Sequence, residues 1–331
     1  MTFIGPRDCI DHFEVISPAN AQRIQEVAIG KGHRSWLKAV AFAHNGTMIA
    51  TASRDHTVVL WDAREASLTP IQVLEGHESL VWSVAFSPDD RLLASCGHDG
   101  SVRLWMLDGE MYEFTRLNDH NGAVYNVAFS ADGRLLATAA HDTTVRLRDI
   151  SALPTTGRIG ASAKLSHISH VYGVALSPDN QWLATASRDS LVRLWPIAGD
   201  LHQLAHTEPY GLGGHQSYLN AVCFSPDSCT LATASHDQTV RLWDLTNRGQ
   251  AHILKGHRDA ITALAYSPDG RTLATTSKDG TVRLWDVRHH REITQIIKPQ
   301  IYSNCLCFSP DGTLLILGWA DGTISGWTVL S

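Results

Sequence analysis

The chain has 331 residues, including 10 Trp and 18 His, and a formal net charge of −6. Its composition, 44% hydrophobic and 18% charged, is too apolar for an intrinsically disordered protein and sufficient for a large core. The mild negative charge argues against a uniformly basic surface that binds duplex DNA.

The N-terminal segment MTFIGPRDCIDHFEV lacks the basic start, apolar run and cleavage site of a secretory signal, and no stretch reaches 18 apolar residues. We expect an N-terminal extension or cap at residues 1–20, with a turn at residues 17–20. The six Cys show no CxxC spacing, so we expect no metal site. We expect Cys223 and Cys307 to be small residues of the core. Cytoplasm is the simplest compartment for this cysteine usage.

From residue 33 onward one motif recurs at a fixed internal spacing. Asp follows a His after 22 residues, and Trp follows the same His after 28 residues. Only the connection from Trp to the next His varies, from 14 to 20 residues. The third copy has Arg148 in place of Trp, and a seventh copy begins with Pro299 in place of His. A constant module with variable connections indicates seven copies of one structural unit.

Within each copy the pattern predicts four short antiparallel strands. In the second copy Val84 and Phe86 alternate, whereas Val81 lies three residues before Val84, so we expect a β-bulge early in this strand. A Ser-Pro-Asp-type turn precedes a second strand, and an Asp-containing turn precedes a third. Connections such as residues 71–74 supply the fourth. Four short strands at even spacing are typical of a propeller blade.

These motifs resemble the WD-repeat β-propeller family. The chain has Gly-His pairs at 32–33, 76–77, 214–215 and 256–257, and Trp-Asp pairs at 61–62, 243–244 and 285–286. The strand and turn sequences VAFSPD at 84–89 and WLATAS at 182–187 are similar to those of bacterial members of the family. The resemblance implies an all-β, seven-bladed propeller of four-stranded antiparallel blades, with repeat cores at 32–62, 76–106, 119–149, 166–196, 214–244, 256–286 and 298–328.

The resemblance also implies how the ring closes. The last copy ends after its third strand, so residues 24–29 are expected to add the outer strand of the seventh blade. The propeller then occupies residues 21–331 as one closed ring, and we expect it to be monomeric within a larger complex.

The resemblance further implies a buried hydrogen-bond relay in each blade. The relay links Asp to His, His to a Ser or Thr hydroxyl, and this hydroxyl to the Trp N–H. Blade 3 lacks the Trp, and blade 7 lacks both the His and, at Leu317, the hydroxyl. Such a set resembles a nucleophile triad, but its repetition favours a structural role over a singular catalytic one. The relay residues predicted in the other five blades are His33, Thr51, Asp55 and Trp61; His77, Ser95, Asp99 and Trp105; His167, Thr185, Asp189 and Trp195; His215, Thr233, Asp237 and Trp243; and His257, Thr275, Asp279 and Trp285.

Family propellers bind partners on the narrow face around the central channel. Three positions per blade reach this face: the residues three and five positions after the frame His, and the residue just before the turn Asp. Of these 21 positions, which we call the channel face, six are Trp or Tyr, four are Lys or Arg, four are His and none is acidic. Such residues favour an interface with an acidic partner. The predicted partner-binding residues are Trp36, Lys38, Arg54, Trp82, His98, Tyr125, His141, His170, Tyr172, Arg188, Tyr218, His236, Lys278 and Tyr302.

We therefore expect a non-catalytic scaffold, without a cofactor, that binds an acidic protein or peptide. Two alternatives remain open. Aromatic stacking would permit binding of single-stranded nucleic acid, although four Lys and Arg are few for that purpose. Propellers of other families include hydrolases, but the channel face offers no acid–base pair or metal-ligand set.

Overall fold

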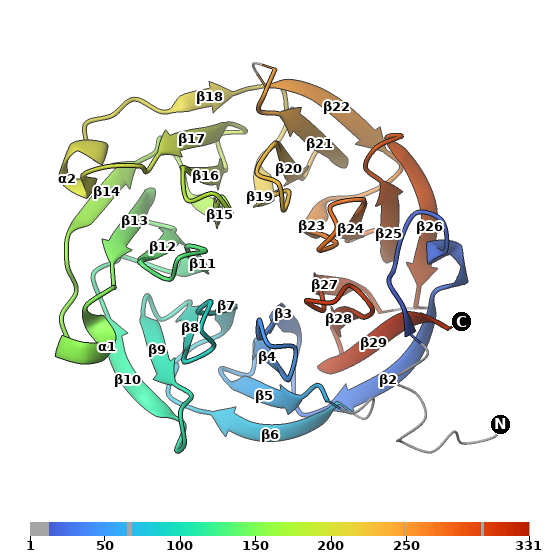
Figure 1. Cartoon of the computed structure of the whole chain (residues 1–331), viewed down its shortest axis with the longest axis horizontal. Coiled ribbons are helices and arrows are strands. Elements are labelled where there is room, and N and C mark those ends of the chain that lie inside the picture. The colour runs from blue at the N-terminus through green and yellow to red at the C-terminus, as the bar shows by residue number, and fades with distance from the viewer. Residues whose placement is uncertain (1–12, 65–67, 248, 299–300, 331) are drawn as a thin grey trace.

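The computed structural model describes residues 13–64, 68–247, 249–298 and 301–330. Seven antiparallel sheets stand around a central channel, which confirms the seven-bladed propeller (Figure 1). The first strands of the blades lie nearest the channel: β3 (Leu37–Phe42), β7 (Val81–Phe86), β11 (Val124–Phe129), β15 (Val171–Leu176), β19 (Leu219–Phe224), β23 (Ile261–Tyr266) and β27 (Ser303–Phe308).

The remaining strands follow outward in chain order, except that the N-terminal strand β2 (Gln25–Lys31) is the outer strand of blade 7. The second strands are β4 (Met48–Ser53), β8 (Leu92–Gly97), β12 (Leu135–Ala140), β16 (Trp182–Ser187), β20 (Thr230–Ser235), β24 (Thr272–Ser277) and β28 (Leu315–Trp319). The third strands are β5 (Val58–Asp62), β9 (Val102–Met106), β13 (Thr144–Asp149), β17 (Val192–Pro196), β21 (Thr239–Asp244), β25 (Thr281–Asp286) and β29 (Thr323–Leu330). The outer strands are β6 (Thr69–Leu74), β10 (Tyr112–Leu117), β14 (Ser162–Ser166), β18 (Tyr210–Leu212), β22 (Gln250–Lys255), β26 (Arg291–Ile297) and β2 (Gln25–Lys31).

The N-terminal strand closes the ring as expected. β2 pairs antiparallel with β29, from Gln25 opposite Thr328 to Lys31 opposite Thr323. The preceding residues form an additional clasp, because β1 (Phe13–Glu14) pairs with the end of β29, and the short helix η2 (Ala21–Arg23) follows. Figure 1 shows β2 beside β29 at the closing blade.

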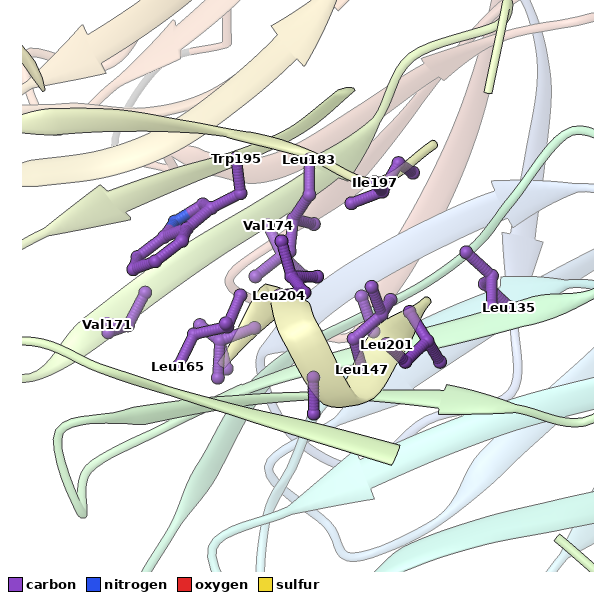
Figure 2. Packing of buried hydrophobic residues seen from close by; sticks show 14 residues of the cluster. Leu135, Leu147, Leu165, Val171, Val174, Leu183, Trp195, Ile197, Leu201 and Leu204 are labelled. Carbon is purple, nitrogen blue, oxygen red and sulfur yellow. The ribbon is translucent and has the colours of Figure 1, made fainter. Parts of the chain in front are cut away.

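Two of the longer connections contain short helices, α1 (Leu153–Thr156) and α2 (Leu201–Leu204). Leu201 and Leu204 of α2 are 2% and 4% exposed, and they pack among side chains of blades 3 and 4, including Leu147 and Leu165 (Figure 2). The helix thus adds apolar contacts between two blades on the outer side of the ring. Most of the core is built in the same way, because each hydrophobic cluster joins adjacent blades.

Every inner strand contains the expected β-bulge. The pairing with the second strand shifts register between Val81 and Ser83 in blade 2, and at the equivalent place in the other six blades. A bulge leaves one residue outside the ladder and turns its side chain. The seven bulged residues therefore have a common orientation, which builds the site described next.

Candidate functional site

The bulged residues line the central channel. They are Lys38, Trp82, Tyr125, Tyr172, Asn220, Thr262 and Asn304, and all seven border a cavity of about 690 Å³. These are the residues that follow the His frame by five positions. The apolar residues of the same strands, such as Val40, Val84 and Leu264, form deeper walls of this cavity.

The other two positions of each blade are neighbours at the edge of the channel. Arg188 N–H donates to the His170 carbonyl at 2.8 Å, and Arg54 N–H donates to the Trp36 carbonyl at 2.9 Å. The equivalent bonds link His98 to Leu80, His141 to Ala123, His236 to Tyr218, Lys278 to Ala260 and Ala320 to Tyr302. The three positions of each blade therefore lie at one end of the propeller.

Six aromatic side chains and one lysine form a connected row, which we call the aromatic arc. In ring order it contains Tyr302, Trp36, Lys38, Trp82, Tyr125, Tyr172 and Tyr218. Ring centroids are 5.4 Å apart for Trp82 and Tyr125 and 4.9 Å apart for Tyr125 and Tyr172. The arc spans blade 7 and blades 1 to 5, and it stops at blade 6, where the positions hold Ala260, Thr262 and Lys278.

Histidines border the arc at blades 3 to 5. His141 stacks on His170 with centroids 3.9 Å apart, and His236 stacks on Tyr218 at 4.3 Å. His98 is exposed and makes no ring contact within the described residues. All fourteen predicted partner-binding residues are at least partly exposed, whereas Ala123 and Ala260 of the same face are buried.

The cations of the channel face lack acidic partners. Within the described residues, Lys38, Arg54, Arg188 and Lys278 make no salt bridge with Asp or Glu. Burial lowers the pKa of the Lys38 amine; Cys305 acts in the opposite direction, and the charges of Arg54 and Lys278 lower it further. The face therefore carries uncompensated positive charge on a protein that is acidic overall.

One exposed apolar residue near this face was missed by the sequence analysis. Ile168 is 84% exposed and directly follows the frame residue His167. The residue after the frame His is polar at Arg34, Glu78 and Asn121. This contrast is the sequence signal that could have singled out Ile168.

The relay is continuous in blades 1, 2, 5 and 6. In blade 5, Trp243 Nε1 donates to Thr233 Oγ1 at 2.9 Å, Thr233 lies 2.8 Å from His215 Nε2, and His215 Nδ1 lies 2.8 Å from Asp237. The Asp237 carboxylate also accepts hydrogen bonds from Thr239 Oγ1 and from Gln216 N–H. An ionised carboxylate only accepts, so His215 Nδ1–H donates to Asp237; the Nε2 atom of the neutral imidazole then accepts from the Thr233 hydroxyl, which accepts from the indole.

Electrostatics agree with this direction of donation. Burial lowers the pKa of His215, which favours the neutral imidazole. Burial alone would raise the pKa of Asp237, but the hydrogen bonds from Thr239, Gln216 and His215 hold it at about 2. The pair is thus a neutral histidine donating to an ionised carboxylate.

Blade 4 corrects the expectation that five blades carry the complete relay. His167 makes no hydrogen bond to Asp189, whose carboxylate instead pairs with Arg193 at 2.8 Å. The bond from Trp195 Nε1 to Thr185 is also long, at 3.4 Å. Burial, followed by the nearby Arg193 charge, lowers the pKa of His167 to about 4.

Blades 3 and 7 replace the missing members in different ways. In blade 3, Arg148 Nη1 donates to Thr138 Oγ1 at 3.0 Å, as the Trp would, and Nη2 donates to Asp119 at 2.6 Å. In blade 7, where Pro299 lies outside the described residues, Trp319 and Trp327 both donate to the Ser325 hydroxyl, at 2.7 and 2.8 Å. Both arrangements satisfy the buried donors without the usual set of residues.

The relay hydroxyls are inaccessible to a substrate. Thr51, Ser95, Thr233 and Thr275 are 0% exposed. Among the residues that the structure describes, no group of three His, Cys, Asp or Glu is arranged to hold a metal ion. These hydroxyls bond both His and Trp in the interior of the blades.

The fold is a seven-bladed β-propeller with a central channel. The family profile described as WD domain, G-beta repeat matches residues 24–62, 68–106, 112–149, 162–196, 206–244, 249–286 and 298–328. The chain therefore belongs to the WD40 repeat family, whose propellers commonly act as protein-interaction scaffolds and are generally non-catalytic. A comparison with curated proteins gave no match. Within the described part of the chain, no helix is sufficiently long and apolar to span a membrane.

Proposed function

We propose that this protein is a non-catalytic scaffold that binds an acidic protein or peptide on its channel face. The observation that carries the proposal is the aromatic arc with four cations and no acidic residue among 21 positions. Tyr, Trp and Arg dominate interface hot spots, and a focused positive potential accelerates association with acidic partners. A cytoplasmic location and a monomeric propeller inside a larger complex belong to the same proposal.

Single-stranded nucleic acid is the second candidate, favoured by the consecutive ring contacts of the arc. Bases stack on such aromatic platforms, and a basic groove then follows the phosphates. Here the cations are divided, because Lys38, Arg54 and Lys278 lie at blades 1 and 6 and Arg188 lies at blade 4. This separation suits an acidic peptide better than a continuous phosphate backbone.

The charge-reversal variant Arg54→Glu with Arg188→Glu tests the proposal. Arg54 and Arg188 are exposed on the channel face and make no salt bridge within the described residues. We expect the variant to retain its melting temperature and to lose the proteins captured by the wild type from a lysate, because two favourable charges become repulsive.

The matched control is Arg91→Glu with Arg271→Glu. These exposed residues lie in turns at the opposite end of blades 2 and 6, and the control makes the same change in net charge. Unchanged capture by the control and lost capture by the channel-face variant would support the proposal. Equal capture by both variants would refute it. Salt-sensitive capture of single-stranded oligonucleotides in place of proteins would favour the second candidate.

A further inference from the structure

The Lys38 ammonium group lies between the indole rings of Trp36 and Trp82, where an aromatic cage would bind the cation of a ligand. Its Nζ lies 5.3 Å from the ring centroid of Trp36 and 5.0 Å from that of Trp82. The chain thus fills the space between these rings with its own positive charge. A cationic ligand would meet Lys38 together with Arg54 and Lys278, so this part of the channel face disfavours cations.

The bulged residues on either side of Lys38 carry unsatisfied donors. Trp82 of blade 2 and Asn304 of blade 7 line the same cavity as Lys38. The Trp82 Nε1 and Asn304 Nδ2 atoms are buried and have no hydrogen-bond partner within the described residues. At the equivalent position of blade 5, Asn220 Nδ2 donates to the Ile261 carbonyl of the neighbouring blade at 2.7 Å. The missing acceptor is therefore particular to this part of the ring.

Three neighbouring positions thus present donors without acceptors, and the central donor is an ammonium group. Buried donors are nearly always paired in native proteins, because an unpaired donor costs the free energy of its lost hydration. No acidic residue belongs to the channel face, so the chain does not supply the acceptor from these positions. An anion with at least two oxygen acceptors would satisfy these donors.

We propose that a carboxylate group of the bound partner, from an Asp or Glu side chain, enters the channel between blades 7, 1 and 2 and accepts a hydrogen bond from Lys38, and that the Trp82 and Asn304 side chains, whose donor atoms are buried before binding, turn to donate to it as well. This inference rests on the proposed function, since the carboxylate belongs to a partner held on the channel face. A carboxylate is small and planar, which suits a single ammonium group between two indole rings. The aromatic arc then contacts the residues of the partner that follow this Asp or Glu.

The probe is fluorescein-labelled hexaglutamate, and its affinity for the protein is measured by fluorescence anisotropy. Labelled hexaglutamine is the uncharged control peptide of the same length. We expect the wild type to bind hexaglutamate and not hexaglutamine. Lys38→Met should weaken binding by about tenfold or more, because it removes a charge-assisted hydrogen bond. Asn304→Leu should weaken it by roughly two- to tenfold, as expected for a neutral hydrogen bond.

Lys298→Met is the matched control. Lys298 Nζ also lies over an indole, 4.8 Å from the Trp319 centroid, but it pairs with Glu26 at 3.8 Å and does not line the channel. This variant should bind hexaglutamate as the wild type does. Equal affinity of the Lys38→Met variant and the wild type, with both shown to be folded by circular dichroism, would overturn the carboxylate site.

The chain contains only six lysines, so a carbon-13 lysine spectrum allows a second measurement. A resonance that Lys38→Met removes is assigned to Lys38, and its pKa should rise when hexaglutamate binds. The groups that face Lys38 and contribute to this titration are Arg54, Lys278 and the Cys305 thiol. An unchanged Lys38 titration at saturating hexaglutamate would also contradict the inference.

The two proposals fail in distinguishable ways. If Arg54→Glu with Arg188→Glu abolishes partner capture while Lys38→Met leaves hexaglutamate affinity unchanged, the channel face binds partners but the carboxylate site is wrong. If neither variant has an effect, the proposed function fails as well. Tighter binding of labelled hexathymidylate than of hexaglutamate would overturn the carboxylate in favour of a phosphate ligand.

Discussion

At the residue scale, the relay depends on one hydroxyl that the four-residue motif does not include. A Ser or Thr two residues after the turn Asp donates to its carboxylate in six blades, at Thr57, Ser101, Thr144, Thr239, Thr281 and Thr323. Blade 4 has Leu191 at this position, and there Asp189 pairs with Arg193 and not with His167. We infer that the hydroxyl helps to hold the carboxylate toward the His.

The contrast between blades 2 and 4 gives a prediction about stability. The His77 imidazole bonds Asp99 at 2.9 Å and Ser95 at 2.8 Å, whereas the His167 imidazole bonds Thr185 but not Asp189. The two histidines are 7% and 8% exposed. We expect His77→Ala to lower the free energy of unfolding by about 1–3 kcal/mol more than His167→Ala does, because it removes one additional hydrogen bond, the one to the Asp99 carboxylate.

Urea denaturation of the two variants measures this difference. Both should retain the wild-type affinity for channel-face ligands, since the relay lies inside the blades. A larger loss in the His167→Ala variant would contradict the role assigned to the Asp bond.

At the same scale, the distance in sequence from the frame His predicts which residues lie on the channel face, but not which side chains they contact. The five-residue offset selected Lys38, Trp82 and Asn304 as channel-face positions. Their common orientation follows from the bulge, which the phase slip in the strand pattern predicts. The placement of Lys38 between two indoles and the unpaired donors beside it depend on rotamers and on packing between blades. A linear pattern carries no information on these.

At the element scale, the N-terminal clasp was the least predictable part of the fold. The residues before β2 predict only an extension or cap with a turn, and the periodic signal begins at β2. Ile16 is nevertheless 0% exposed, and its N–H donates to the Gly312 carbonyl at 2.9 Å. It belongs to the hydrophobic cluster shared by blades 6 and 7, together with Ala21. A single apolar residue in a nonrepeating segment gives no periodicity by which to recognise it.

Ile16→Ala tests how much the clasp stabilises the propeller. We expect a loss of about 2–5 kcal/mol in the free energy of unfolding, as for other large-to-small substitutions in a packed core. Val15→Ala is the matched control, because Val15 is 46% exposed and should lose little. If the melting temperatures of the two variants coincide, the clasp does not contribute to the core.

At the scale of the whole molecule, β2 joins the two ends of the ring. It completes the blade 7 sheet on β29, and Ala28 packs in one cluster with Trp61 of blade 1 and Ile324 of blade 7. The close approach of backbone at Gly30 tightens this junction, because a Cβ there would lie 2.8 Å from the Trp61 ring. The sequence predicted this closure from a missing outer strand, since a propeller with one unpaired edge is prone to aggregate.

Deletion of residues 21–30 removes most of this strand and should open the ring. β29 would then expose an unpaired edge, and the apolar contacts between blades 7 and 1 would be lost. Because 1 kcal/mol shifts the melting temperature of a large domain by about 2–4 °C, we expect a decrease of about 10 °C or more. Light scattering should show aggregation at concentrations where the wild type is monodisperse, since free strand edges pair between molecules. A deletion variant with the wild-type melting curve and scattering would show that the ring closes without β2.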